Sequence, residues 1–174
     1  MNAAEAAAVG IIGAAGALLY FVFFSFVWGA GYEPTPRRIA QQMVDWAEIG
    51  PDDVVVDLGA GTGRLVFAAL ARHPRRVVAV EIEPLRWAWL RARRRRSPDR
   101  ERLVVLRSDL RQVDLTEATV VTTFLWPGLM ATLAPKFQRE LRRGARVVSH
   151  GHPIPDWTPT AIDLRSQLFR YDVR

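Results

Sequence analysis

The sequence predicts an α/β fold with a mainly parallel sheet, preceded by one transmembrane helix. Two observations predict this architecture. Short, valine-rich apolar runs alternate with amphipathic helical patterns, as in sheets whose strands are buried on both faces. An uncharged apolar stretch, residues 6–30, precedes them. The expected strands are residues 54–58, 77–82, 103–106, 120–125 and 145–149.

Helical patterns separate the expected strands, and right-handed crossovers would connect parallel neighbours. The first pattern ends at Gly50-Pro51, which is a helix stop. After Trp157, the segments TAIDLR and QLFRYDV are expected to pair as a closing hairpin. The expected helices are residues 37–49, 65–72, 85–96 and 129–141.

Residues 6–30 are expected to form a membrane anchor. A helix of this length spans ~37 Å, which exceeds the ~30 Å hydrocarbon core of a bilayer. Trp28 and Tyr32 suit the membrane interface. A signal peptide would have a positive n-region and a shorter apolar core, and a buried core helix would be shorter, with a polar stripe. We therefore predict an anchor over residues 1–31 and one domain over residues 32–174.

Charge predicts the orientation of that domain. Basic residues are absent before the span and appear after it at Arg37 and Arg38. The positive-inside rule then predicts a single-pass membrane protein whose domain faces the cytoplasm. The net charge is +6, and Lys136 is the one lysine among 24 basic residues. A basic surface favours acidic partners such as nucleic acid or anionic lipid headgroups. The run RARRRR, residues 91–96, is either a solvated helix end or a contact with anionic headgroups.

Composition excludes several kinds of site. Cysteine is absent, which excludes disulfides, thiolate nucleophiles and cysteine metal sites. The three histidines, His73, His150 and His152, lack acidic neighbours at ligand spacing, so no metal site is expected.

The stretch VVVDLGAGTGRLVFAAL, residues 54–70, runs from a strand through three glycines into a helix. Gly59, Gly61 and Gly63 permit positive φ and a close approach of the backbone to a ligand. The start of the following helix offers N–H groups to an anion. The spacing is GxGxG, which differs from the dinucleotide fingerprint GxGxxG and from the P-loop. The turn is therefore either a cofactor cradle or a plain tight turn.

Two carboxylates strengthen the first interpretation. Asp57 lies near the end of the first expected strand, and Glu81 lies at the end of the second, where it could accept hydrogen bonds from two ribose hydroxyls. The alternatives are a helix or turn cap for Asp57 and a solvated strand end for Glu81.

These motifs, DLGAGTG and VVAVEIEP, resemble those of class I S-adenosylmethionine-dependent methyltransferases, which have a Rossmann-like domain. The resemblance implies that the glycine turn holds the methionine part of the cofactor and that Glu81 holds its ribose. It also places Asp109, in LRSDL, near the adenine. Asp109 could equally be a simple turn residue.

A narrower resemblance covers residues 32–157. YEPTP, the strand in ATVVTTFLWPG and the strand in GARVVSH are similar to the FAM173-type protein-lysine methyltransferases, which include membrane-associated and soluble members. This resemblance implies that Thr35 closes over the cofactor, although Thr35 could instead be a linker cap. The family tends to have Tyr-Leu where this chain has Phe124-Leu125. The signature [DN]PP[YF] of nucleobase methyltransferases is absent, so no nucleic-acid partner is expected.

Residues 122–127, TTFLWP, are the expected acceptor pocket. A lysine must lose its proton before it accepts a methyl group, and an apolar pocket near a sulfonium lowers its pKa. Phe124 and Trp126 would supply apolar walls, and Pro127 has no N–H to donate, which leaves that rim rich in acceptors. Both aromatic residues could instead belong to the core. His150 could orient the acceptor, relay a proton, or make a structural hydrogen bond.

The sequence therefore predicts a membrane-anchored protein-lysine N-methyltransferase that uses S-adenosyl-L-methionine. Its partners would be membrane lipid and a protein substrate bearing a lysine, plausibly a membrane protein. One alternative is a methyltransferase that acts on a lipid or small amphiphile. The other is a cofactor-binding scaffold without activity, an interpretation that depends on Phe124.

Overall fold

A computed structural model describes residues 2–27 and 33–174. It separates into two units, Met1–Glu33 and Pro34–Arg174. The first contains the helix α1 (Ala3–Val27). Residues Ala3–Tyr20 of α1 are long and apolar enough to cross a membrane, and none of them is buried. Trp28, Tyr32 and the predicted boundary between residues 31 and 32 lie outside the described residues.

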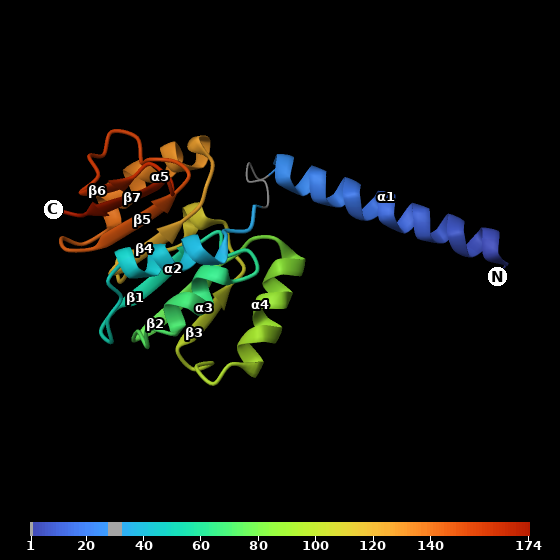
Figure 1. The fold of residues 1–174 in the computed structure, drawn as a ribbon, viewed down its shortest axis with the longest axis horizontal. Helices are drawn as coiled ribbons and strands as arrows, with labels where there is room; N and C mark the ends of the chain where they lie inside the picture. Colours follow the sequence, from blue (N-terminus) through green and yellow to red (C-terminus); the bar gives the residue numbers. More distant parts are fainter. Residues whose placement is uncertain (1, 28–32) are drawn as a thin grey trace. The chain divides into compact units, whose positions relative to one another are not determined.

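The second unit is built on a seven-stranded sheet with the order β3-β2-β1-β4-β5-β7-β6 (Figure 1). Neighbouring strands from β3 to β5 are parallel. β7 runs antiparallel to both β5 and β6, which confirms the closing hairpin. The strands are β1 (Val54–Leu58), β2 (Arg76–Val80), β3 (Leu103–Leu106), β4 (Val120–Thr123), β5 (Arg146–His150), β6 (Ala161–Asp163) and β7 (Leu168–Asp172).

Helices cover both faces of the sheet. Figure 1 shows α2, α3 and α4 on one face and α5 on the other. Alternation along β1 divides the core accordingly, because Val55 packs with the first group of helices and Val56 packs with α5. The helices are α2 (Arg37–Trp46), α3 (Arg64–Leu70), α4 (Pro84–Arg96) and α5 (Pro127–Glu140), with a short 3₁₀ turn, η1 (Leu110–Gln112).

Proline accounts for two of the differences from the predicted boundaries. α4 and α5 begin earlier than their apolar patterns, at Pro84 and Pro127, because proline suits the first turn of a helix. β4 ends at Thr123 instead of residue 125, since the chain there turns toward α5.

α5 also carries the one lysine of the sequence. Lys136 is buried, and its Nζ lies 2.5 Å from Oε2 of Glu140, one turn further along the helix. A buried ion pair of this geometry holds the amine protonated and fixed in place.

Candidate cofactor and acceptor site

The candidate site lies where the strand order reverses. β1 pairs with β2 on one side and with β4 on the other, although β2 follows β1 in sequence and β4 does not. In open α/β sheets, ligands bind beyond the carboxyl ends of the strands at such a switch point. The glycine turn follows β1, Glu81 follows β2, and the segment TTFLWP contains the end of β4.

The glycine turn is fastened to the end of β2. The backbone N–H groups of Gly59 and Ala60 both donate to the carbonyl of Val80, at 3.0 and 2.8 Å. Gly63 has φ +87°, and an added Cβ there would lie 2.6 Å from Cδ2 of Leu90. A side chain cannot fit at that position without displacing α4, so the turn is held close to the helix layer.

Glu81 is a buried anchor of this turn. Its side chain is 4% exposed, which excludes a solvated strand end. Oε2 accepts a hydrogen bond from Gly61 N–H at 2.8 Å, and Oε1 accepts one from Glu83 N–H at 2.9 Å. Arg86 Nη2 approaches Oε1 at 3.4 Å. A carboxylate has about four acceptor positions, so Oε2 retains one for a ribose hydroxyl, and a second hydroxyl would compete with the long Arg86 contact.

Asp57 is a second buried carboxylate, and it acts as neither a helix cap nor a turn cap. Its Oδ1 accepts a hydrogen bond at 2.8 Å from Thr122 Oγ1 on the neighbouring strand. Burial raises the pKa of Asp57 to about 7; the Thr122 hydrogen bond opposes this rise and the charge of Glu81 adds to it. Within the described part of the chain, Asp57 has no ion-pair partner. A cation placed beside this carboxylate would therefore be its first counter-charge.

Thr35 lies in the segment that leads into α2. It is buried, and its carbonyl accepts a hydrogen bond at 2.8 Å from Arg64 Nη1 at the start of α3. The N-cap of α2 is Pro36, and no side chain among the described residues caps that helix, so Thr35 is not a cap. The contact holds Thr35 next to the residue that follows the glycine turn.

Asp109 is the N-cap of η1. Its carboxylate accepts hydrogen bonds from the backbone N–H and the guanidinium of Arg111. The hydrogen bond with the Arg111 side chain holds the pKa of Asp109 below its usual value. The structure thus gives Asp109 the role of a turn residue, and an adenine contact would have to share this carboxylate with Arg111.

The predicted acceptor residues form an aromatic rim, defined here as residues 124–127 with His150. The Phe124 ring packs on the buried His150 ring, with centroids 4.2 Å apart. Trp126 is 55% exposed, so its interpretation as a core residue is wrong. Pro127 is exposed at the first turn of α5. Thr122, expected in this pocket, is fully buried and binds Asp57 instead.

The rim adjoins the cradle. An added Cβ on Gly59 would lie 3.1 Å from Leu125 Cδ2, which belongs to the segment that forms the rim. Gly151, with φ +80°, lies close to the Phe124 ring, since its added Cβ would be 2.8 Å from Cε2. The backbone on both sides of the rim therefore requires glycine, and the rim is held against the turn that would bind the cofactor.

Sequence reasoning missed the pair that completes the ribose end of the site. Glu83 is buried and caps α4 by accepting hydrogen bonds from the backbone of Leu85 and Arg86. Arg86 also approaches the Glu81 carboxylate from within α4. The available signal was Pro84, because a proline at the start of a helix marks the preceding acidic residue as a candidate N-cap.

The chain is similar to several characterised proteins. The ANTKMT methyltransferase domain matches residues 57–161. A protein-lysine N-methyltransferase of Saccharolobus islandicus (strain REY15A) is 36% identical over 139 residues, which are 79% of this chain and 86% of that protein. A lysine N-methyltransferase of Xenopus laevis that is named for ATP synthase is 33% identical over 163 residues, 89% of this chain and 70% of that protein.

Among solved structures, an RNA methyltransferase from Salinibacter ruber in complex with S-adenosyl-L-homocysteine has a TM-score of 0.77 and 32% identity, with 81% of this chain and 94% of that chain covered. Fold and site thus define a class I S-adenosylmethionine-dependent methyltransferase. Within that class, the chain belongs to the ANTKMT methyltransferase family, which confirms the resemblance found in the sequence.

The residues present fit S-adenosylmethionine. Two buried carboxylates, Asp57 and Glu81, meet at one sheet edge with little cationic compensation, as suits a ligand that carries a sulfonium and an ammonium group. The glycine turn leaves space that side chains would fill. When bound, the cofactor supplies an activated methyl group. The protein holds that group and its acceptor in line and excludes water.

Proposed function

We propose that this chain is a membrane-anchored methyltransferase that modifies the ε-amine of a lysine in a protein located at the membrane. The observation that carries the proposal is the contact between Gly59 and Leu125, through which the aromatic rim adjoins the glycine turn. An amine that entered past Trp126 would meet Phe124 and His150 before it reached the cofactor edge.

The rim suits a neutral amine. Lysine has a pKa of about 10.4 in water, so the acceptor must be deprotonated to act as a nucleophile. An apolar wall made by Phe124 disfavours the ammonium form. Pro127 offers no N–H, so backbone carbonyls at this rim are free to accept hydrogens from the amine. His150 lies against Phe124 and would orient the acceptor or relay its proton.

The names of the relatives favour a protein acceptor. The archaeal and the frog relative are both named as lysine N-methyltransferases. The Salinibacter protein is instead named an RNA methyltransferase, and the +6 charge of this chain keeps that acceptor open to test. The rim sequence FLWP contains no [DN]PP[YF] signature, which argues for the protein.

Membrane anchoring rests on α1. This helix of 25 residues is longer than the ~30 Å hydrocarbon core requires. The match to the Xenopus relative covers 89% of the chain, a share larger than Pro34–Arg174 can supply, so it includes part of the N-terminal segment. We infer an anchor over residues 1–31, a catalytic domain over residues 32–174, and a cytoplasmic location for that domain from Arg37 and Arg38.

One transfer experiment tests the acceptor. The full-length protein in detergent would be incubated with radiolabelled S-adenosylmethionine and a membrane extract, and the products would be separated into protein, lipid and RNA. The expected result is an acid-stable protein label that hydrolysis identifies as methyl-lysine. The Glu81→Ala variant is the control, since its carboxylate no longer supports the cofactor edge.

Each other outcome contradicts a stated part of the proposal. Label in lipid alone would indicate the amphiphile methyltransferase, and label in RNA alone would indicate a nucleic-acid enzyme. Cofactor binding by calorimetry without transfer to any fraction would indicate an inactive scaffold.

Orientation can be tested with a single cysteine, because the chain has none of its own. Gln138→Cys on the exposed side of α5 should resist a membrane-impermeant maleimide in intact cells and react after permeabilisation. Labelling of intact cells would place the domain on the opposite side of the membrane.

A further inference from the structure

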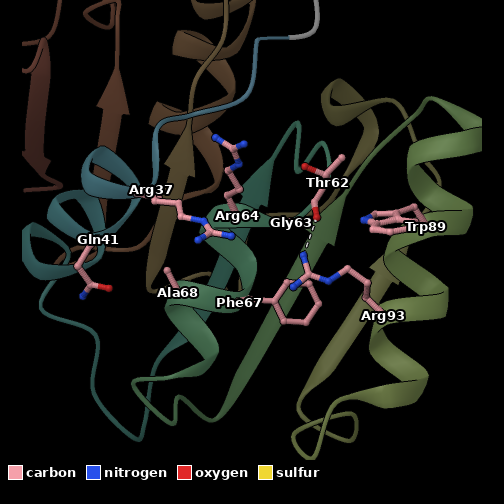
Figure 2. A pocket seen from close by; sticks show the side chains of 10 residues that line it. Arg37, Gln41, Thr62, Gly63, Arg64, Phe67, Ala68, Trp89 and Arg93 are labelled. Atoms are coloured by element: carbon pink, nitrogen blue, oxygen red, sulfur yellow. Dashed lines mark hydrogen bonds between the residues drawn. The ribbon is translucent and has the colours of Figure 1, made fainter.

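A basic groove lies on the helix layer, beside the cofactor edge. It has a volume of about 490 Å³ and runs over α3, between α2 and α4. Figure 2 shows Arg37 and Gln41 from α2 on one side, Trp89 and Arg93 from α4 on the other, and Phe67 and Ala68 of α3 at its base. Its upper end is formed by Thr62 and Gly63, so only the back of the glycine turn touches it.

Among the residues that the structure describes, three guanidinium groups line this groove and no carboxylate does. In the described part of the chain, Arg37, Arg64 and Arg93 form no salt bridge with an acidic side chain. The partners of two of them are neutral: Arg64 donates to the Thr35 carbonyl at 2.8 Å, and Arg93 donates to the Thr62 carbonyl at 3.1 Å. Three cations gathered without a counter-charge create a positive potential that an anion would neutralise.

Arg93 is also held in position by its surroundings. Its guanidinium lies 3.8 Å from the centroid of the Phe67 ring, a cation–π contact that fixes the plane of the fork. One N–H is used by Thr62, so the remaining donors of Arg93 stay available at the groove. A guanidinium fork matches the oxygens of a phosphate in a bidentate manner. The groove thus has the chemistry of a phosphate site.

We propose that this groove binds the headgroup phosphate of an anionic phospholipid. The inference rests on the membrane anchoring proposed above. Only residues 28–36 separate Val27, the end of α1, from Arg37, and an extended chain of that length reaches about 30 Å at most. Trp89 is 56% exposed beside the arginines, and tryptophan is the side chain that favours the headgroup level of a bilayer.

The source of the phosphate follows from charge and position together. A headgroup near the membrane surface is present at high local concentration, and each arginine near an anionic surface strengthens the attraction about fivefold. The groove is separate from the aromatic rim, so a bound lipid would leave the acceptor entrance open. Occupancy would hold the domain in one orientation on the bilayer, with the rim presented to membrane-embedded substrates.

The test measures lipid binding by the full-length protein in an uncharged detergent. Dioctanoyl-phosphatidylglycerol, and dioctanoyl-phosphatidylcholine as the zwitterionic comparison, would be titrated while tryptophan fluorescence is recorded. The expected result is saturable binding of the anionic lipid. Arg37→Gln combined with Arg93→Gln should weaken it about 25-fold. The matched control, Arg143→Gln with Arg165→Gln, removes the same charge from exposed positions elsewhere and should change affinity less than twofold.

Several results would overturn the proposal. Equal weakening by the groove pair and the control pair would show a general effect of net charge. Inorganic phosphate or an oligoribonucleotide that binds this groove as tightly as the lipid would assign the site to another anion. Arg37→Gln alone changes one exposed side chain in the first turn of α2 and should still cost about fivefold if the double variant fails to fold. The titration requires no methyl acceptor, so its failure is distinguishable from a failure of the methyltransferase proposal.

Discussion

Cofactor binding should release a proton from Asp57. The pKa of this buried carboxyl is about 7, against an ordinary value of 3.8, because burial disfavours its charged form. Ionising it without a partner therefore costs about 4 kcal/mol. A cationic cofactor beside Asp57 would supply the missing partner, so the carboxylate form would bind and the neutral form would not.

The magnitude follows from the fraction that is ionised. At pH 8 about nine-tenths of Asp57 carries its charge, and at pH 6 about a tenth does. Affinity for S-adenosylmethionine should therefore fall about tenfold from pH 8 to pH 6, with close to one proton released per cofactor at the lower pH. Asp57→Asn keeps the acceptor for Thr122 and should bind more weakly, with this share of the pH dependence removed.

Calorimetry in two buffers of different ionisation enthalpy counts the released protons. Subtracting the asparagine variant removes titration of the cofactor itself. Equal proton release by both proteins at pH 6 would refute the reasoning, because it would show that Asp57 does not change charge on binding.

The same shift has a defined sign for stability. Since the folded-state pKa is raised, the contribution of Asp57 is fully favourable below pH 3.8 and is lost as the pH rises to about 7. Without cofactor, denaturation of the Asp57→Asn variant should show a smaller loss of stability across that window.

Three further substitutions test the rest of the site. Glu81→Ala should weaken S-adenosylhomocysteine binding by about 1 kcal/mol or more, the worth of a buried charge-assisted hydrogen bond; unchanged affinity in a titration would contradict its role. Gly63→Ala should lower the free energy of unfolding by about 2 kcal/mol or more in urea, since its Cβ would lie 2.6 Å from Leu90, whereas Gly128→Ala, with nothing within 4 Å, should not. Phe124→Tyr restores the hydroxyl typical of the family and should raise kcat/KM up to about fivefold; no change would show that the hydroxyl is dispensable here.

The sheet could be predicted because its signal is local. Val54–Leu58 is a nearly unbroken apolar run, and burial on both faces is what such a run requires. The edges of the site were less accessible. Trp126 and Phe124 are both aromatic and lie two positions apart, yet one is exposed and the other half-buried, because their environment depends on how α5 leaves the sheet. No sequence period reports that direction.

The electrostatic state of the site also required the fold. The partner of Glu81 is the backbone of Gly61, twenty positions earlier, and that of Asp57 is Thr122, on a strand 65 positions later. A sequence identifies such carboxylates as candidates, whereas their burial and the raised pKa of Asp57 arise only when β1, β2 and β4 lie side by side.

The isolation of Lys136 gives this enzyme a clean chemical background. The sequence contains no other side-chain amine, and this one is enclosed and paired with Glu140. Copies of the enzyme therefore cannot serve as decoy acceptors for one another through a surface lysine. Amine-reactive reagents can be used in the same way to modify a candidate substrate while the catalyst is spared, so that lost methylation reports on the substrate's lysines alone.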